Sequence, residues 1–286
     1  MLTHDTWRER LDEDMRLHDF RGSTREAYAL AARQFVDWFG KDPSLATDAD
    51  VRAYLLHLRE EKKLAPSTVN VALCGLRFFF CASLGRDWPV FGIARVNVPH
   101  RLPVVLSRPE VFALLAAVHH PVRRMALATI YACGLRLNEG LGLETGDIDG
   151  DRLLVWLRDA KGARDRGVPL PRPLLARLRT YWKTERPASP TKFLFVAQGA
   201  TTPLHETTVQ KTFSAARIDA GIDKPATTHT LRHSYGTHLL EAGISLRTIQ
   251  ALLGHKSLRT TMVYLHVTTP GVEHVQETLD RLMVGL

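Results

Sequence analysis

A proline-broken stretch near residue 100 limits the possible folds of this chain more than any other feature. The stretch from Val96 to Pro103 reads Val-Asn-Val-Pro-His-Arg-Leu-Pro, with both prolines in its last five residues. Because proline lacks a backbone N–H and clashes with a preceding helical turn, this stretch can be neither a helix interior nor a central strand. A chain of 286 residues is also longer than most single cores. We therefore expect a first domain at residues 1–98, a linker at 99–103 and a second domain at 104–286.

Charge is distributed unequally along the chain. Residues 1–100 hold 14 Lys or Arg and 14 Asp or Glu, so their formal net charge is zero. Residues 101–286 hold 24 basic and 16 acidic side chains and carry the whole net charge of +8. A basic region favours a polyanionic partner such as nucleic acid, although charge alone fits a solvated basic surface equally well.

Composition excludes several classes of protein. Hydrophobic residues make up 45% and charged residues 24%, which is typical of globular chains and excludes wholesale disorder. No apolar run reaches the roughly 20 residues that span a bilayer, and the acidic N-terminal segment lacks the pattern of a signal peptide. The three cysteines, Cys74, Cys81 and Cys133, lie in apolar segments with helical periodicity. We therefore expect reduced core thiols in a cytoplasmic protein with no membrane partner.

Hydrophobic periodicity predicts mainly helical structure in both domains. In the first, apolar residues recur at helical spacing and no alternating strand pattern occurs, which indicates about four helices. In the second, the β-prone run 153–157, the polar loop 158–166 and the run 168–170 indicate a hairpin. We expect helices in the second domain at 173–184, 206–221, 231–242, 245–253 and 260–266, and a last amphipathic helix after Pro270.

A histidine and an arginine in the second domain form the first candidate for chemistry. His229-Thr-Leu-Arg232 places these two side chains three residues apart at a helix start, and therefore on one face. Imidazole and guanidinium groups beside apolar leucines are costly to bury unless an anion neutralises them, and a phosphate would do so. The alternative is a helix whose polar side happens to be basic. A zinc site is less favoured, because no cysteine or carboxylate lies at ligand spacing.

Four further residues are weaker candidates when each is taken alone. Arg136, which follows an apolar stretch, is either a surface charge or a buried one paired with Glu139 at i+3. Lys161 lies at the expected hairpin tip, where most lysines are solvated. His255 follows Gly254, a fitting helix C-cap, and Tyr264 could be an ordinary half-buried packing residue.

In order and spacing, these residues resemble the tyrosine recombinases, also called the phage integrase family. The motifs that carry the resemblance are Gly134-Leu-Arg136, Lys161-Gly162, His229-Thr-Leu-Arg232-His-Ser, and Leu253-Gly254-His255 with Tyr264 nine residues on. The N-terminal helices resemble the core-binding, SAM-like domain of the family, so the resemblance covers nearly the whole chain. Gly140 and Gly236 depart from it, since relatives usually carry alanine or a larger residue there, and we expect a local cost in helix stability.

The resemblance implies an enzyme that cleaves and rejoins DNA through a 3′-phosphotyrosyl intermediate. Tyr264 would be the nucleophile, and Arg136 with Arg232 would neutralise the phosphate as bidentate donors. Lys161 would protonate the leaving 5′-hydroxyl, His229 would act in proton transfer at the tyrosine, and His255 would hydrogen-bond the phosphate. Because two arginines do what a divalent metal does elsewhere, neither a metal nor a cofactor is implied.

The expected partners are double-stranded recombination sites and further recombinase subunits. Phosphate contacts are expected from four basic residues, namely Arg164, Arg166, Lys256 and Arg259. By the resemblance, the terminal helix in 271–286 passes to a neighbour in a tetramer of this recombinase or of this and a related one. Its apolar seam fits packing on its own core as well. Such an enzyme would work in the bacterial cytoplasm, at the nucleoid.

Three alternatives remain open at this point. Within the family, an integrase or transposase of a mobile element is favoured over a chromosome-dimer resolvase of the Xer type. A type IB topoisomerase would share the nucleophile and the arginines but would not choose sites. A non-catalytic regulator is the alternative from another class, because residues 241–263 resemble a helix-turn-helix.

Overall fold

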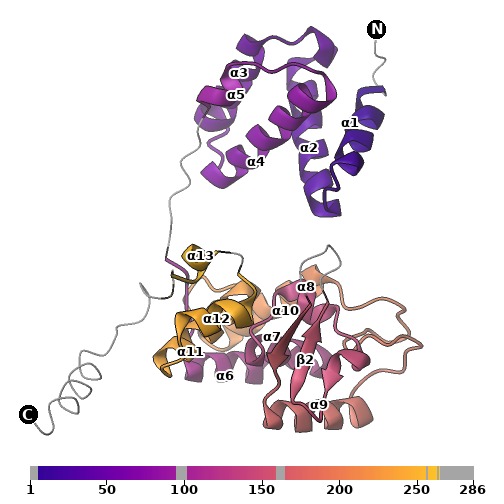
Figure 1. Ribbon diagram of the computed structural model, residues 1–286, viewed down its shortest axis with the longest axis vertical. Helices are drawn as coiled ribbons and strands as arrows, with labels where there is room; N and C mark the ends of the chain where they lie inside the picture. The colour runs from indigo at the N-terminus through magenta and orange to yellow at the C-terminus, as the bar shows by residue number, and fades with distance from the viewer. Residues whose placement is uncertain (1–5, 95–101, 159–164, 256, 263, 265–286) are drawn as a thin grey trace, which may run out of the picture. The chain divides into compact units, whose positions relative to one another are not determined.

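The computed structural model describes residues 6–94, 102–158, 165–255, 257–262 and 264 (Figure 1). Its contacts divide the chain into two compact units, residues 1–100 and 101–286. Most of the expected linker at 99–103 lies outside the described residues, as does the expected terminal helix in 271–286. None of the helices described is both long and apolar enough to cross a membrane.

The first unit is entirely helical in its described part (Figure 1). Its α-helices are α1 (Thr6–Leu17), α2 (Gly22–Phe39), α3 (Asp48–Leu56), α4 (Pro66–Arg77) and α5 (Val90–Ile93). A capping box fixes the start of α3, because the backbone N–H of Asp50 donates to Thr47 Oγ1 and that of Thr47 donates to the Asp50 carboxylate. Gly75 lets α4 approach α2 closely, since a Cβ there would lie 3.0 Å from Ala31 Cβ.

The core of this unit contains a group of aromatic side chains among its aliphatic residues. Phe35, Phe79 and Phe80 are fully buried, and the rings of Phe35 and Phe80 meet edge to face with centroids 5.3 Å apart. Helix α1 adds Trp7, Leu11 and Met15, all almost fully buried. Spacing of four residues puts these three side chains on one face of α1. The sequence pattern does not predict this helix, because its many acidic and basic residues obscure a stripe of only three apolar positions.

The second unit combines helices with a small sheet, as the sequence predicts (Figure 1). Its helices are α6 (Arg108–Ala117), α7 (Pro121–Ala132), α8 (Leu137–Leu141), α9 (Arg172–Thr184), α10 (Glu206–Asp219), α11 (Thr228–Glu241), α12 (Leu246–Leu253) and α13 (Leu258–Met262). Strands β1 (Ile148–Asp149), β2 (Leu154–Leu157) and β3 (Arg166–Pro169) form an antiparallel sheet in the order β1-β2-β3. Val155 pairs with Ile148 on one side and with Val168 on the other. The two-residue β1 carries too short a pattern to be predicted.

Helix α11 occupies a central place in this unit. It packs against α7, α10 and α12, and the Oγ of its buried Ser234 accepts a hydrogen bond from the backbone N–H of Leu106 at 2.9 Å. The helix begins at Thr228, three residues before the predicted start, because Thr227 and Thr230 form a capping box there. His229 therefore lies in the first turn of α11.

The three cysteines are all free thiols, but they differ in exposure. Cys133 is buried at the end of α7, and burial raises the pKa of its thiol to about 12. Cys81 is partly buried. Cys74 is exposed, so the expectation of a core thiol is wrong at that position: it lies on the outward side of α4, whose buried side carries Leu73 and Leu76.

Candidate active site

The turn between α7 and α8 brings Arg136 to the middle of the second unit. Gly134 has a left-handed φ of +61°, and a Cβ there would lie 2.3 Å from a ring carbon of Tyr235 on α11. Only glycine fits such a turn at such a close approach. Arg136 follows as the N-cap of α8, and its backbone N–H donates to Glu139 Oε2 at 2.8 Å. Its guanidinium pairs with Glu139 Oε1 at 2.7 Å and remains 45% exposed.

Arg232 is the most deeply buried charged side chain that the structure describes, with 1% of its surface exposed. It donates from Nη1 to the carbonyl of Gly134 at 2.8 Å and from Nη2 to the carbonyl of Leu253. These two bonds join α11 to the turn before α8 and to the end of α12. Burial and the neighbouring Arg136 lower the pKa of Arg232 to about 10, so the side chain is still charged at neutral pH.

The carboxylate of Glu139 lies among three arginines. Besides Arg136, it accepts two bonds of 2.9 Å from Nη2 of Arg166 on β3, and it lies 3.5 Å from Nη1 of Arg232. Burial opposes ionisation of Glu139, but the Arg136 backbone N–H and the nearby guanidinium groups outweigh it and lower the pKa of the carboxyl. One negative charge thus faces three positive ones. The cluster keeps an excess of positive charge that an anion such as a phosphate would neutralise.

Two histidines on α11 and one after α12 lie beside this cluster. The rings of His229 and His233 meet edge to face with centroids 4.6 Å apart. Gly254 ends α12 with a left-handed φ of +62°, and the chain then turns so that Nδ1 of His255 lies 3.0 Å from Thr261 Oγ1. Burial, reinforced by nearby positive charge, lowers the pKa of His229 and brings that of His255 to about 4.

Tyr264 is fully buried against the same histidines. Its hydroxyl lies 3.4 Å from Nδ1 of His233, and its ring stacks on that of His255 with centroids 6.4 Å apart. Burial raises the pKa of the Tyr264 hydroxyl, while the charge of Arg232 acts against that rise. The phenol is therefore protonated at neutral pH and must give up its proton before it can attack.

The structure brings five of the six predicted catalytic residues together, namely Arg136, His229, Arg232, His255 and Tyr264. Lys161, Arg164 and Lys256 lie outside the described residues, and so does the side chain of Arg259. Arg166, predicted to contact DNA, pairs with Glu139. Sequence reasoning missed His233, although one signal was present: it follows Arg232 directly and lies one helical turn after His229.

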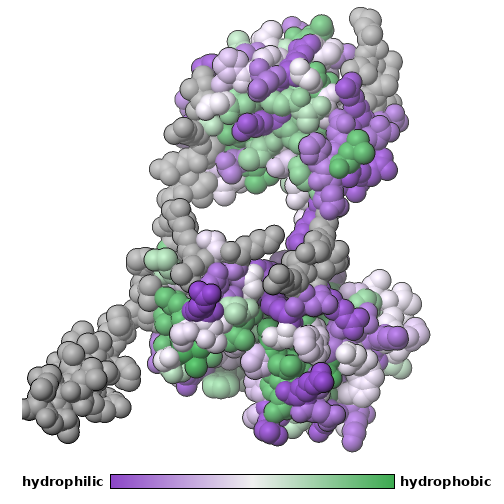
Figure 2. All heavy atoms as spheres, viewed as in Figure 1, coloured by the Kyte–Doolittle hydropathy of each residue, from purple (hydrophilic) through white to green (hydrophobic). Residues whose placement is uncertain are grey.

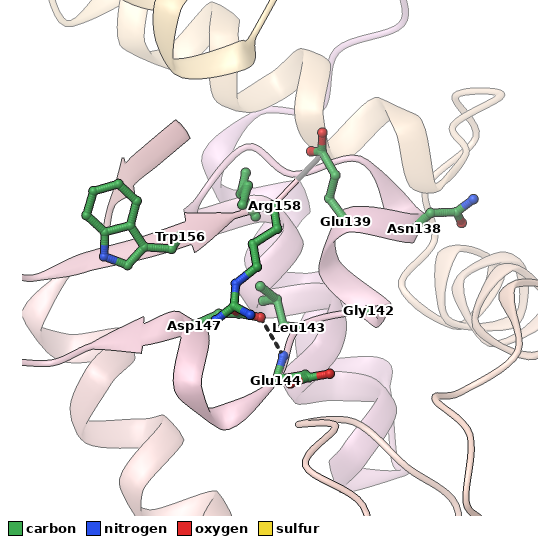
Figure 3. A pocket seen from close by; sticks show the side chains of 9 residues that line it. Asn138, Glu139, Gly142, Leu143, Glu144, Asp147, Trp156 and Arg158 are labelled. Atoms are coloured by element: carbon green, nitrogen blue, oxygen red, sulfur yellow. Dashed lines mark hydrogen bonds and ion pairs between the residues drawn. The ribbon is translucent and has the colours of Figure 1, made fainter. Parts of the chain in front are cut away.

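A hollow of about 220 Å³ lies next to the cluster and shares Glu139 with it (Figure 3). Its lining includes Trp156 of β2, Arg158 just after that strand, and the buried Asp147. Arg158 Nε lies 3.1 Å from Asp147 Oδ1, and the backbone N–H of Glu144 donates to Asp147 Oδ2 at 2.8 Å. Because these polar groups pair with one another, we assign no chemistry to the hollow. On the face seen in Figure 2, hydrophilic side chains gather on the second unit near α8.

The two arginines Arg136 and Arg232, with histidines and a buried tyrosine beside them, have the chemistry of an enzyme that acts on phosphate esters through a tyrosine. The model of the phage integrase family matches residues 105–270, and that of the phage integrase N-terminal SAM-like domain matches residues 7–90. The chain belongs to the phage integrase family, the tyrosine recombinases, whose members cleave and rejoin DNA through a tyrosine intermediate.

The similarity to known proteins covers most of the chain. A Sinorhizobium fredii protein named as an integrase/recombinase, y4qK, is 40% identical over 263 residues, covering 92% of this chain and 84% of the relative. The tyrosine recombinase XerA of Thermococcus kodakarensis is 33% identical, with 90% of this chain and 88% of the relative covered.

Solved structures show the same fold. A crystal structure of a XerA recombinase matches with a TM-score of 0.54 and 25% identity over 98% of this chain and 99% of that one. The Tn1549 transposon integrase, solved with transposon right-end DNA, matches with a TM-score of 0.70 over 96% of this chain and 99% of that one. At 17% identity, the second likeness concerns the fold alone.

Proposed function

We propose that this tyrosine recombinase exchanges strands at specific double-stranded DNA sites through a 3′-phosphotyrosyl intermediate. The observation that carries the proposal is the cluster in which Arg136 and Arg232 face a single carboxylate beside the buried Tyr264. A phosphodiester gains negative charge as its phosphorus becomes five-coordinate, and two fixed guanidinium groups stabilise that charge. A phosphotyrosyl link keeps the energy of the broken bond for religation.

Each remaining residue has a proposed task in this reaction. His229 takes part in proton transfer at Tyr264, and His255 donates a hydrogen bond to the phosphate. Lys161, on the segment between β2 and β3, protonates the leaving 5′-hydroxyl. The arginines supply the charge that a metal supplies in other phosphoryl-transfer enzymes, so the reaction proceeds with neither metal nor cofactor.

We further propose that a mobile element encodes this protein, as an integrase or transposase. In support, the relative named as an integrase/recombinase is more similar, at 40% identity, than the XerA relative at 33%. The alternative is a chromosome-dimer resolvase of the Xer type, which the match to XerA, over 90% of this chain and 88% of the relative, also supports. Sequencing the DNA joined by the enzyme in cells separates the two, because only a resolvase acts between copies of one chromosomal site.

The proposed partners are DNA and other recombinase subunits, in the bacterial cytoplasm at the nucleoid. Arg164, Arg166, Lys256 and Arg259 contact phosphates and fix the register on the duplex. If Arg164 and Arg166 contact phosphates, replacing both by alanine reduces the slope of log affinity against log salt concentration. The reduction should correspond to about two phosphate contacts. An unchanged salt slope would contradict the hairpin contacts.

Residues 271–286 pass to a neighbouring subunit in the proposed tetramer, which consists of this chain or of this chain and a related recombinase. Deleting this segment should leave DNA binding intact and abolish recombination. If the truncated protein instead becomes insoluble, the segment packs on its own core.

A covalent-trapping experiment tests the activity. Purified protein is incubated, with EDTA present, with nicked suicide duplexes made from the DNA that flanks its own gene. Adducts that resist SDS are expected from the unaltered protein and not from Tyr264→Phe. Strong duplex binding with no adduct on any fragment would contradict the catalytic proposal and favour the non-catalytic regulator.

A further inference from the structure

We propose that His233 is the residue that takes the phenolic proton from Tyr264, and that Gly236 makes the space in which the phenol is held against it. This inference rests on the proposed function, because it assigns a residue to one step of that reaction. His229 then affects this proton transfer indirectly, through the edge-to-face contact of its ring with the ring of His233.

The position of His233 is the first support. It belongs to α11, directly after the buried Arg232, and its Nδ1 lies 3.4 Å from the hydroxyl oxygen of Tyr264. Catalytic hydrogen bonds are often long before substrate binds and shorten in the reacting complex. His229 packs edge to face on the ring of His233, so the three groups follow one another in the order Tyr264, His233, His229.

Gly236 provides the second support. A Cβ at this glycine would lie 2.7 Å from Cζ of Tyr264, the carbon that bears the hydroxyl, and 2.9 and 3.1 Å from the two carbons beside it. Real Cβ contacts essentially never fall below 3.0 Å, so a side chain at position 236 would force the ring or the helix to shift. His233 and Gly236 are three residues apart and share one face of α11. Together, His233 and Gly236 form a seat for the phenol.

The protonation states agree with this role. Burial, followed by the neighbouring His229 and Arg232, lowers the pKa of His233 to about 4, so its imidazole is neutral at pH 7 and can accept a proton. Burial also raises the pKa of the Tyr264 hydroxyl, which keeps its proton until the attack. A phosphate bound at Arg232 would offset the positive charge that weakens this base, so the imidazole becomes more basic when DNA is present.

In the proposed step, the oxygen of Tyr264 forms a bond to phosphorus as the bond from phosphorus to O5′ breaks. The phenolic proton passes to Nδ1 of His233, and the departing O5′ receives a proton from Lys161. Religation reverses both transfers, so that His233 returns its proton to the tyrosine as the 5′-hydroxyl attacks.

The test separates proton removal at the nucleophile from proton supply at the leaving group. The rate of adduct formation is measured on a natural suicide duplex and on one with a 5′-bridging phosphorothiolate, whose thiolate leaves without a proton. Each is repeated with 3,5-difluorotyrosine at position 264, because its ring fluorines acidify the hydroxyl and reduce the need for a base. His233→Asn is the main variant, since its amide oxygen lies near the place of Nδ1 and accepts a hydrogen bond but not a proton.

We expect His233→Asn to slow adduct formation about 100-fold, the size typical of a lost general base. Difluorotyrosine should restore most of that loss, and the phosphorothiolate should restore none of it. Lys161→Ala should behave in the opposite way. His229→Asn is the matched control on the same face of α11, with a smaller loss than His233→Asn.

Folding and function are checked separately. Melting temperature and duplex affinity are measured for every variant, and His233→Gln serves as a second substitution if the asparagine variant does not fold. Adduct formation by either folded variant at the unaltered rate, or a loss that difluorotyrosine does not relieve, would overturn the inference while leaving the proposed function intact. A larger rescue in His229→Asn would assign the proton to His229 instead. If the unaltered protein itself forms no Tyr264-dependent adduct, the proposed function falls, and this inference with it.

Discussion

The interiors of the two units differ in their polarity. In the described part of the first unit, Ser83 is the one buried polar side chain, in a core of aliphatic and aromatic residues. In the second unit, α11 alone buries six polar or charged side chains: Thr228, Thr230, Arg232, Ser234, Thr237 and His238. Burying polar groups opposes folding unless each finds a partner, so apolar residues would stabilise the same helix more simply. The first interior therefore serves stability alone, whereas α11 combines structural polar contacts with the buried Arg232 of the candidate site.

A substitution in the aromatic core should separate the two roles most strongly. Phe80→Ala removes a fully buried ring and should cost about 3–5 kcal/mol of unfolding free energy. Hydrogen exchange read by mass spectrometry should show faster exchange in residues 6–94 and no change in α11, and saturating protein should still form adduct at the normal rate. The exposed Phe112 gives the control, because Phe112→Ala should alter stability by no more than about 0.5 kcal/mol. If Phe80→Ala accelerated hydrogen exchange equally in both units, the two units would not be independent in stability.

A substitution on α11 should do the reverse. Arg232→Lys keeps one positive charge but loses the planar group that bonds the carbonyls of Gly134 and Leu253. We expect adduct formation to fall about 100- to 1000-fold, as for the loss of one preorganised donor, with little change in duplex affinity. Arg217→Lys is the matched control, since Arg217 also bonds backbone carbonyls, those of Ile222 and Lys224, away from the cluster. A loss of similar size in both variants would mean that Arg232 acts through folding alone.

Acid should destabilise the second unit before the first. The pKa values of His233 and His255 are lowered from 6.5 to about 4 in the folded protein. A lowered pKa means that these neutral imidazoles favour the folded state above pH 6.5 and that this contribution is lost as the pH falls toward 4. Glu139, whose pKa lies below its usual 4.5, extends the same trend to lower pH.

We expect the second unit to lose roughly 2–4 kcal/mol between pH 7 and 5, measured by urea denaturation followed by unit-specific hydrogen exchange. Glu139→Gln should leave this loss unchanged and reduce only the further loss below pH 4.5. Equal sensitivity of both units over this range would contradict the shifts that we assign to burial.

The smallest effect is expected at the seat for the phenol. Gly236→Ala forces the Tyr264 ring away from His233, and adduct formation should fall about tenfold, equivalent to ~1.4 kcal/mol of activation free energy. Stability should change little, because the gain of about 1 kcal/mol from alanine in a helix offsets the crowding. Gly92→Ala in α5, where the added carbon meets open space, should leave adduct formation unchanged. An unaltered rate in Gly236→Ala would show that the phenol does not depend on this glycine.

These contrasts also show what the sequence could predict. Periodicity predicted most helices and the β2–β3 hairpin, because each depends on neighbours within a few residues. The order of Arg136, His229, Arg232, His255 and Tyr264 pointed to the family, since residue type and spacing carry that information. The identity of the family in turn predicted that these side chains would meet.

The rest depends on contacts between distant segments. The sequence around Arg166 does not indicate that this residue pairs with Glu139, 27 residues earlier. Gly236 was expected to weaken its helix, but the structure gives it a different meaning, because the ring of Tyr264 occupies the space of the absent side chain. Only the three-dimensional arrangement of β3, α8 and α11 reveals these two relations.

The carboxylate of Glu139 has a consequence for how the site can change over generations. Arg136, Arg166 and Arg232 all share this one acidic group, so replacing any of them alters the charge balance for the other two. The residues at these four positions should therefore co-vary among related sequences. Loss of Glu139 would leave three positive charges without their shared carboxylate, so a second substitution that restores the charge balance would be favoured. Positions on a strand, a turn and a helix are thereby coupled in evolution.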